Sequence, residues 1–359
     1  MKEKKLMKGN EAFAEAAIRG GCSLYFGYPI TPQNEIPEYM SRELHKVGGT
    51  FAQAESELAA INMAYGGALT GKHVFISSSS PGIALMQEGM SFLASAEVPL
   101  VIMNVSRGGP GVGGIQPGQG DYRQVTKGGG NGDYHVPVFA PASIQESVDI
   151  IYEAVPIADE YRNPVMVLVD GMLGQMMEPV VLPPIRRQIT SEEIAQKKPW
   201  ALTGHKGERT HNVVKSLRLK PDELEKHNIH LEDKYKKMKR ELIRYQTDRL
   251  QGATVVFVAF GTMSRIINEA VDHLEKAGIK AGIIRPISLW PFPDQAFDEI
   301  DPCTKVIISA ELSLGQMMED IKSAVAGRFP VELIYRVGGM VPTPMEVADK
   351  TKKILEVIA

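Results

Sequence analysis

The chain has 359 residues and a formal net charge of −3, so it is long enough for two domains but lacks an overall basic field for nucleic acid. Aromatic residues, at 7% of the sequence, are too few for a base-stacking surface, and no run of about 18 apolar residues could span a membrane. The basic N-terminus lacks the apolar core of a signal peptide and the two cysteines, Cys22 and Cys303, form no paired motif, so we expect a cytoplasmic protein without a disulfide framework or a cysteine-bound cluster.

Short apolar runs alternate with helical patterns through most of the chain. The expected strands cover residues 24–28, 74–77, 100–105, 136–139, 165–169, 254–260, 281–284, 305–309 and 331–335. Helical spacing of apolar residues falls between them, at residues 10–20, 144–160, 265–277 and 344–357. This alternation predicts an α/β fold with parallel sheets and helices on both faces, in which ligands bind beyond the carboxyl ends of the strands.

The first expected strand ends in the turn Tyr28-Pro29-Ile30-Thr31-Pro32. Its two prolines restrict the backbone around Thr31, so that the threonine hydroxyl and the neighbouring amide are presented above the sheet. Thr31 is therefore a candidate ligand-binding residue. A rigid turn with a structural threonine is the alternative.

A second candidate site begins where apolar residues recur at helical spacing after Ser56, a suitable N-cap residue. Glu57 then lies in the first helical turn, where the helix dipole favours a carboxylate. The next strand ends in four serines followed by Pro81 and Gly82, a polar turn that can open another helix. These features indicate a ligand-binding rim, although a capping acid and an ordinary turn would give the same pattern. Glu55 is the rival carboxylate, and it should point elsewhere if the helix begins at Ser56.

Two glycine-rich segments have the spacing of phosphate-binding loops. Residues 66–73 fit GxxxxGK, but the segment closes a helix and enters a strand, which is the reverse of a P-loop. Residues 109–114 fit GxGxxG after a strand, but the glycine- and proline-rich residues 116–120 cannot form the helix of a dinucleotide fingerprint. What remains is a glycine loop with Arg107 at its base, suited to bind a carboxylate. A surface salt bridge by Arg107 is the alternative.

Composition changes between residues 182 and 251, where prolines are followed by dense charge. Apolar residues from Leu231 to Tyr245 follow a helical stripe, which predicts an amphipathic connecting helix. Four of the eight histidines lie in this segment without a cysteine or acid cluster, so we expect surface histidines and no metal site. We divide the chain into an α/β domain at 1–195, a charged linker at 196–251 and a smaller α/β domain at 252–359.

Four motifs, in this order and spacing, resemble the alpha subunit of 2-oxoacid:ferredoxin oxidoreductases: Tyr28-Pro29-Ile30-Thr31-Pro32, Ser56-Glu57, Ser79-Ser80-Pro81-Gly82 and Arg107-Gly108-Gly109-Pro110. The segment from Arg285 to Pro293 is similar to the family's transketolase-C-like domain, so the resemblance covers nearly the whole chain. Among the branches of the family, the chain most resembles the branched-chain (3-methyl-2-oxobutanoate) subunit. The 2-oxoglutarate branch is the alternative.

The resemblance implies oxidative decarboxylation of a branched-chain 2-oxo acid to acyl-CoA and CO2, with thiamine diphosphate as cofactor, coenzyme A as co-substrate and reduction of ferredoxin. Domain 1–195 would bind the cofactor's pyrimidine, with Glu57 matching the glutamate that hydrogen-bonds N1′. Thr31 and Arg107 match the family's substrate-binding residues, Arg107 through charge-assisted bonds to the substrate carboxylate. The cofactor would also contact Pro29, Ser80, Pro81 and Gly82, and the substrate Gly108 and Gly109.

The resemblance also predicts partner subunits, because two features of the complete enzyme are missing from this sequence. The diphosphate-binding domain of thiamine enzymes carries GDG followed by Asn-Asn, whereas here Val169-Asp170-Gly171 is the nearest match and no Asn-Asn follows. The cysteines for iron–sulfur clusters are also missing. We therefore expect a beta subunit that brings the diphosphate-binding domain and Mg²⁺, and gamma and ferredoxin-like delta subunits that bring the clusters. A non-catalytic α/β subunit that binds an anion or serves as a scaffold is the alternative of a different class.

Overall fold

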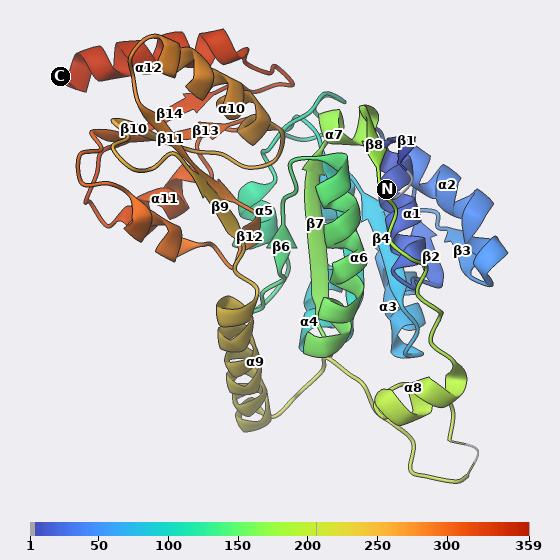
Figure 1. The fold of residues 1–359 in the computed structure, drawn as a ribbon. Helices are drawn as coiled ribbons and strands as arrows, with labels where there is room; N and C mark the ends of the chain where they lie inside the picture. The colour runs from blue at the N-terminus through green and yellow to red at the C-terminus, as the bar shows by residue number, and fades with distance from the viewer. Residues whose placement is uncertain (1–3, 206, 359) are drawn as a thin grey trace.

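Two α/β sheets make up the computed structural model, which describes residues 4–205 and 207–358 (Figure 1). The first sheet has seven strands in the order β12-β6-β7-β5-β4-β2-β3. Six of them run parallel, and only the edge strand β12 is antiparallel to its neighbour. The strands are β2 (Leu24–Gly27), β3 (Thr50–Gln53), β4 (Val74–Ser78), β5 (Leu100–Ser106), β6 (Val138–Phe139), β7 (Pro164–Asp170) and β12 (Ser288–Trp290).

Helices cover both faces of this sheet, which is why every residue of the central strands β5 and β7 is buried. On one face α1 (Gly9–Arg19) packs beside α6 (Ile144–Tyr161), and on the other α3 (Glu57–Leu69) packs beside α4 (Ser80–Ser95) (Figure 1). The shorter elements are β1 (Lys5–Lys8), which pairs with β8 (Met177–Val180), and the helices α2 (Glu35–Glu43), η1 (Leu44–Val47), α5 (Tyr122–Thr126) and α7 (Gly171–Gln175).

The second sheet has five strands in the order β14-β13-β10-β11-β9 and its own apolar core. Its strands are β9 (Tyr245–Asp248), β10 (Val255–Val258), β11 (Ala281–Pro286), β13 (Val306–Glu311) and β14 (Val331–Tyr335), with β9 antiparallel. Its helices are α10 (Gly261–Lys276), η2 (Asp294–Glu299), α11 (Met318–Val325) and α12 (Pro344–Ile358). Because β12 also lies in this part of the chain, a strand from the second half completes the edge of the first sheet.

Two helices lie in the connecting segment, α8 (Ser191–Lys197) and α9 (Pro221–Glu241). The amphipathic prediction holds for α9, whose buried side chains are Leu231, Tyr235 and Met238. The prediction was wrong at Tyr245, because the helix ends at Glu241 and Tyr245 starts β9, where it pairs with Pro286. Backbone pairing with the second sheet thus overrides the helical spacing of the side chains.

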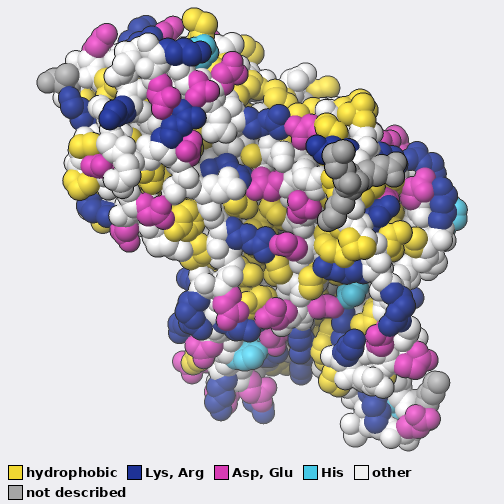
Figure 2. All heavy atoms as spheres, viewed as in Figure 1, with side chains coloured by type: hydrophobic (Ala, Val, Ile, Leu, Met, Phe, Trp, Pro, Cys, Tyr) yellow, Lys and Arg dark blue, Asp and Glu magenta, His cyan; other side chains and the backbone are white. Residues whose placement is uncertain are grey.

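The α/β prediction is confirmed, and each strand expected from the sequence has a counterpart in the structure. The strands that the pattern did not predict are β1, β3, β8, β9 and β12, which have two partly exposed faces or only a few residues. No helix within the described residues is long and apolar enough to cross a membrane. Figure 2 shows basic and acidic side chains interspersed over one face of the molecule, rather than gathered into a basic stripe.

Candidate active site

The candidate residues come together at one edge of the first sheet, because parallel strands end on the same side. Thr31 follows β2, Glu57 follows β3, Ser80 follows β4 and Arg107 follows β5. These four strands are neighbours in the order β5-β4-β2-β3. Segments that are far apart in the sequence therefore form one continuous rim.

Glu57 is the first residue of α3, and Ser56 caps this helix as predicted. The Ser56 hydroxyl accepts a hydrogen bond from the backbone N–H of Ala59 at 3.1 Å. The Glu57 side chain is directed toward Gly82 at the start of α4, and the residue is only 6% exposed. Glu55, in contrast, is exposed, so the buried carboxylate at this position is that of Glu57.

The Glu57 carboxylate accepts no hydrogen bond from any residue that the structure describes. The Ser78 hydroxyl lies close to it, because both flank the Cβ position of Gly82, and it is buried without a partner among the described residues. The hydroxyl of the adjacent Ser79 is also buried and also lacks a partner among the described residues. Since buried polar groups are nearly always hydrogen-bonded in folded proteins, this cluster fits a ligand that supplies polar groups of its own.

Arg107 contacts Thr31, although β4 lies between the strands that these two residues follow. Its Nη1 donates a hydrogen bond of 2.8 Å to the backbone oxygen of Thr31, and its Nη2 donates one of 2.8 Å to the backbone oxygen of Val112. The residue is 8% exposed, and its Nε has no partner among the described residues. The glycine loop at residues 108–114 thus folds back over its own arginine, and the guanidinium is bound to main-chain oxygens rather than to a carboxylate of any described residue.

The remaining predicted residues lie around these two. The Thr31 hydroxyl is half-buried and accepts a 3.4 Å hydrogen bond from Asn34, whereas Pro29 is exposed on the same turn. Ser80, Pro81, Gly108 and Gly109 line a cavity of about 840 Å³, whose opposite wall comes from the second domain. The cavity therefore lies between the two domains, beside the rim.

One buried acid at this site had no signal in the sequence. Asp121 follows the glycine loop, is 8% exposed, and accepts hydrogen bonds from the Ser80 hydroxyl at 2.7 Å and the Asn104 amide at 2.9 Å. Burial raises the pKa of Asp121, although these hydrogen bonds act in the opposite direction. Its neighbours come from β5 and α4, so no local pattern marks it.

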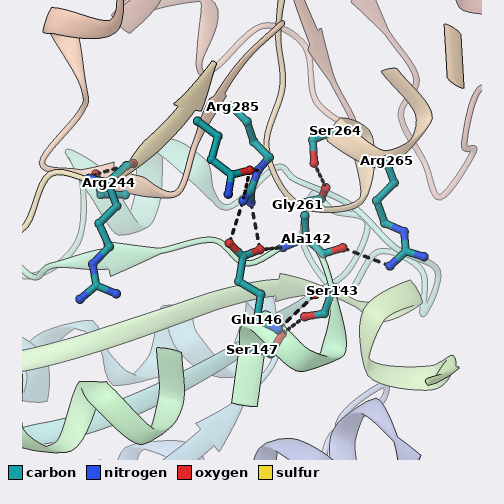
Figure 3. A network of polar contacts seen from close by, with 11 residues as sticks. Ala142, Ser143, Glu146, Ser147, Arg244, Gly261, Ser264, Arg265 and Arg285 are labelled. Atoms are coloured by element: carbon teal, nitrogen blue, oxygen red, sulfur yellow. Dashed lines mark hydrogen bonds and ion pairs between the residues drawn. The ribbon is translucent and has the colours of Figure 1, made fainter. Parts of the chain in front are cut away.

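The second domain is fixed over this edge of the sheet by ion pairs (Figure 3). Arg285 of β11 forms a bidentate pair with Glu146 of α6, with N–O distances of 2.7 and 3.0 Å. Arg265 of α10 donates to the Ala142 carbonyl and to Glu178, at 3.2 and 2.6 Å. Such bidentate, partly buried pairs set relative orientation more than they add stability.

No group of three or more His, Cys, Asp or Glu side chains placed to hold a metal ion occurs among the described residues. Histidines of the connecting segment instead contact the first domain: His227 bonds the Ser95 carbonyl at 2.7 Å and His230 lies 3.1 Å from Glu97.

Comparison with protein families matches residues 15–247 to the thiamine-diphosphate-binding domain of pyruvate flavodoxin/ferredoxin oxidoreductases. Residues 253–347 match core domain II of pyruvate:ferredoxin oxidoreductase. These two matches meet close to the boundary between α9 and the second sheet, and together they include every candidate residue described above.

Curated relatives cover the chain almost completely. The ketoisovalerate oxidoreductase subunit VorB of Methanothermobacter thermautotrophicus is 46% identical over 355 residues, which cover 98% of this chain and 97% of the relative. The 2-oxoglutarate synthase subunit KorA of Methanocaldococcus jannaschii is 35% identical over 361 residues, covering 95% and 97%.

Among solved structures, the 2-oxoglutarate:ferredoxin oxidoreductase from Magnetococcus marinus, with 2-oxoglutarate, coenzyme A and succinyl-CoA bound, superposes with a TM-score of 0.86 at 25% identity. The match covers 98% of this chain but only 65% of that chain, which therefore carries additional sequence.

Proposed function

We propose that this chain, which belongs to the pyruvate flavodoxin/ferredoxin oxidoreductase family, supplies the pyrimidine-binding half of the active site of a thiamine-diphosphate-dependent 2-oxoacid:ferredoxin oxidoreductase. The reaction we assign to the complex is the oxidative decarboxylation of a branched-chain 2-oxo acid, 3-methyl-2-oxobutanoate, to acyl-CoA and CO2. Ferredoxin accepts the electrons, and we place the complex in the cytoplasm.

The observation that carries this proposal is the buried carboxylate of Glu57, which has no hydrogen-bond partner among the described residues. Thiamine diphosphate, when bound, supplies a nucleophilic carbon for the 2-oxo group and an electron sink for decarboxylation. Glu57 would hold a hydrogen bond at N1′ of the aminopyrimidine, where its carboxyl group favours the basic form of the exocyclic nitrogen. The absence of a side chain at Gly82 leaves room for Glu57, and the Ser78 hydroxyl, which has no partner among the described residues, lies beside the same position.

Arg107 and Thr31 would orient the substrate on the same rim. The guanidinium already lies beneath the glycine loop with one Nη on the Val112 carbonyl, a neutral acceptor that a substrate carboxylate can replace with a charge-assisted bond. Its other Nη, bound to the Thr31 carbonyl, keeps the two residues together during this exchange.

The surface around Glu57 supports a shared active site. Leu58, Met63 and Leu85 are exposed on α3 and α4 around the Glu57–Gly82 contact. We assign this surface to the beta subunit, which would hold the diphosphate and Mg²⁺. Gamma and ferredoxin-like delta subunits would carry the iron–sulfur clusters.

The assignment of 3-methyl-2-oxobutanoate as substrate is supported by sequence identity and by a second cavity. Identity is 46% to the ketoisovalerate subunit and 35% to the 2-oxoglutarate subunit. A cavity of about 550 Å³ is lined by Ile115, Met172 and Met340, and none of its described lining residues is charged. Pro117, which also lines it, forms an isolated antiparallel β-bridge with Arg107, so the cavity lies close to the arginine. An apolar side chain fits such a wall, whereas the second carboxylate of 2-oxoglutarate would find no cation there.

The test is steady-state turnover of the complex co-expressed with its partner subunits, with 3-methyl-2-oxobutanoate, 2-oxoglutarate and pyruvate as substrates. We expect the highest kcat/KM for 3-methyl-2-oxobutanoate, with coenzyme A consumed and ferredoxin reduced. A preference for 2-oxoglutarate would overturn the substrate assignment and support the alternative branch. A complex that turns over none of the three would overturn the proposed function.

A further inference from the structure

Asp121 stands at the N-cap position of α5 but does not cap this helix. An aspartate at this position ordinarily accepts hydrogen bonds from the first backbone N–H groups of its helix. Here the carboxylate is turned away from α5 toward Asn104 of β5 and Ser80 of α4. The burial of this carboxylate is costly, so its orientation requires a reason outside its own helix.

The reason lies in how the Ser80 hydroxyl is used. A hydroxyl carries one hydrogen, and the Ser80 hydroxyl donates it to Asp121 Oδ2 at 2.7 Å. Its oxygen then accepts the backbone N–H of Arg107 at 3.0 Å. The Arg107 carbonyl lies 3.3 Å from the same hydroxyl, but the charged and closer acceptor is favoured.

We infer that Asp121 is a positioning residue for the proposed reaction, which acts through Ser80 on the main chain of Arg107. This inference rests on the proposed function, because it concerns the arginine assigned to the substrate carboxylate. Asp121 touches neither the Arg107 guanidinium nor Glu57 by a hydrogen bond within the described residues. It holds the start of α4 and the end of β5 at a fixed separation, and these two segments carry the residues assigned to cofactor and substrate.

The second domain keeps Asp121 in place through the neighbouring Gln119. The Gln119 side chain donates to the Phe260 carbonyl at 2.9 Å and accepts the Leu312 N–H at 2.9 Å. Its backbone N–H also donates to the Leu312 carbonyl at 3.0 Å. With Gln119 only 2% exposed, the segment before Asp121 is anchored to the ends of β10 and β13. The position of Arg107 is thereby tied to the second domain.

The inference is tested on the co-expressed complex with Asp121→Ala and Asp121→Asn. Asp121→Ala should raise the KM for 3-methyl-2-oxobutanoate about tenfold and lower kcat by less than about threefold, because the arginine is misplaced while the chemistry at the cofactor is kept. Asp121→Asn retains a carbonyl oxygen that can accept the Ser80 hydrogen bond, so its KM should lie close to the wild-type value. Should Asp121→Ala fail to fold, Ser80→Ala removes the same link and should raise KM in the same way.

Asp159→Asn is the matched control. Asp159 is a partly buried carboxylate at the opposite end of the sheet, where it pairs with His73 and Lys198 and not with Ser80. This variant should lower the unfolding temperature and leave KM within about twofold of wild type. An unchanged KM in Asp121→Ala and Ser80→Ala, or an Asp121→Asn complex as impaired in KM as Asp121→Ala, would overturn the inference. A wild-type complex inactive on every 2-oxo acid would instead overturn the proposed function.

Discussion

The carboxylate of Glu57 lies directly against the backbone of Gly82: a Cβ atom at position 82 would be 2.6 Å from Glu57 Oε1 and 2.0 Å from the hydroxyl oxygen of Ser78. Real Cβ atoms do not approach so closely, so only glycine fits between the first turns of α3 and α4. The glycine in the Ser-Ser-Pro-Gly turn thus serves the placement of an acid that lies 25 residues earlier in the sequence.

Gly82→Ala should therefore displace Glu57. The expected result is a loss of about 1–3 kcal/mol in the unfolding free energy from overpacking, together with weaker binding of thiamine diphosphate to the complex. Gly66→Ala is the matched control, because no atom lies within 4 Å of its Cβ position inside α3. That variant should raise the unfolding free energy of the chain by about 0.5–1 kcal/mol. Equal effects of the two variants would contradict the packing of Glu57 on Gly82.

Glu57→Gln tests the assigned chemistry at constant side-chain volume. The complex should assemble normally, but its kcat should fall on the order of 100-fold or more, because the amide cannot hold a proton at N1′ as a carboxyl group does. Glu55→Gln alters an exposed carboxylate two residues earlier and should leave kcat unchanged. A fully active Glu57→Gln complex would favour the non-catalytic scaffold.

Arg107→Met should raise the KM for 2-oxo acids roughly 30-fold or more, since a charge-assisted bond to the substrate carboxylate is lost. The affinity for thiamine diphosphate should change less. Arg123→Met serves as the control, because this exposed arginine pairs with Glu319 and not with the rim. An unchanged KM in Arg107→Met would reject the role of Arg107 in substrate binding.

Asp159 lies at the end of the sheet opposite the candidate site, and its ion pairs should make the stability of the fold depend on pH. Burial raises the pKa of Asp159, but hydrogen bonds and charges from His73 and Lys198, at 2.6 Å each, outweigh burial, and the net result is a lowered pKa. A carboxylate with a lowered folded-state pKa stabilises the fold above its unfolded value, at about pH 3.9, and this stabilisation is lost as the pH falls through the folded-state pKa.

The unfolding free energies of wild type and Asp159→Asn should therefore differ most near neutral pH and converge as the solution is acidified below about pH 4. Denaturant titrations of the chain across this range measure the difference directly. A gap that stays constant down to about pH 2 would contradict the lowered pKa of Asp159.

The sequence predicted that the candidate residues share one edge of the sheet, because the signals that mark them are local. Ser56 and Glu57 combine a cap with a first-turn acid, and Thr31 lies between two prolines, so their positions depend on a few neighbouring residues. The alternation of strands and helices then indicated that these turns share one edge. The structure adds that Arg107 and Thr31 are hydrogen-bonded to each other, which spacing alone does not specify.

The features that the sequence did not reveal depend on contacts between distant segments. Asp121 looks like an ordinary helix-capping residue until β5 and α4 are placed beside it. The strand at Tyr245 has the side-chain spacing of the preceding helix, and only its pairing with Pro286 makes it a strand. Likewise, β12 has three residues and is defined by its pairing with β6 in the other domain's sheet.

The most direct measurement is a titration of thiamine diphosphate, with Mg²⁺ present and absent, into the purified chain and into the complex with its partner subunits. The isolated chain would contact only the pyrimidine half of the cofactor, so it should show no tight, magnesium-dependent binding. The complex should bind the cofactor tightly and only with Mg²⁺. Tight, magnesium-dependent binding by the isolated chain would contradict the assignment of the diphosphate site to another polypeptide.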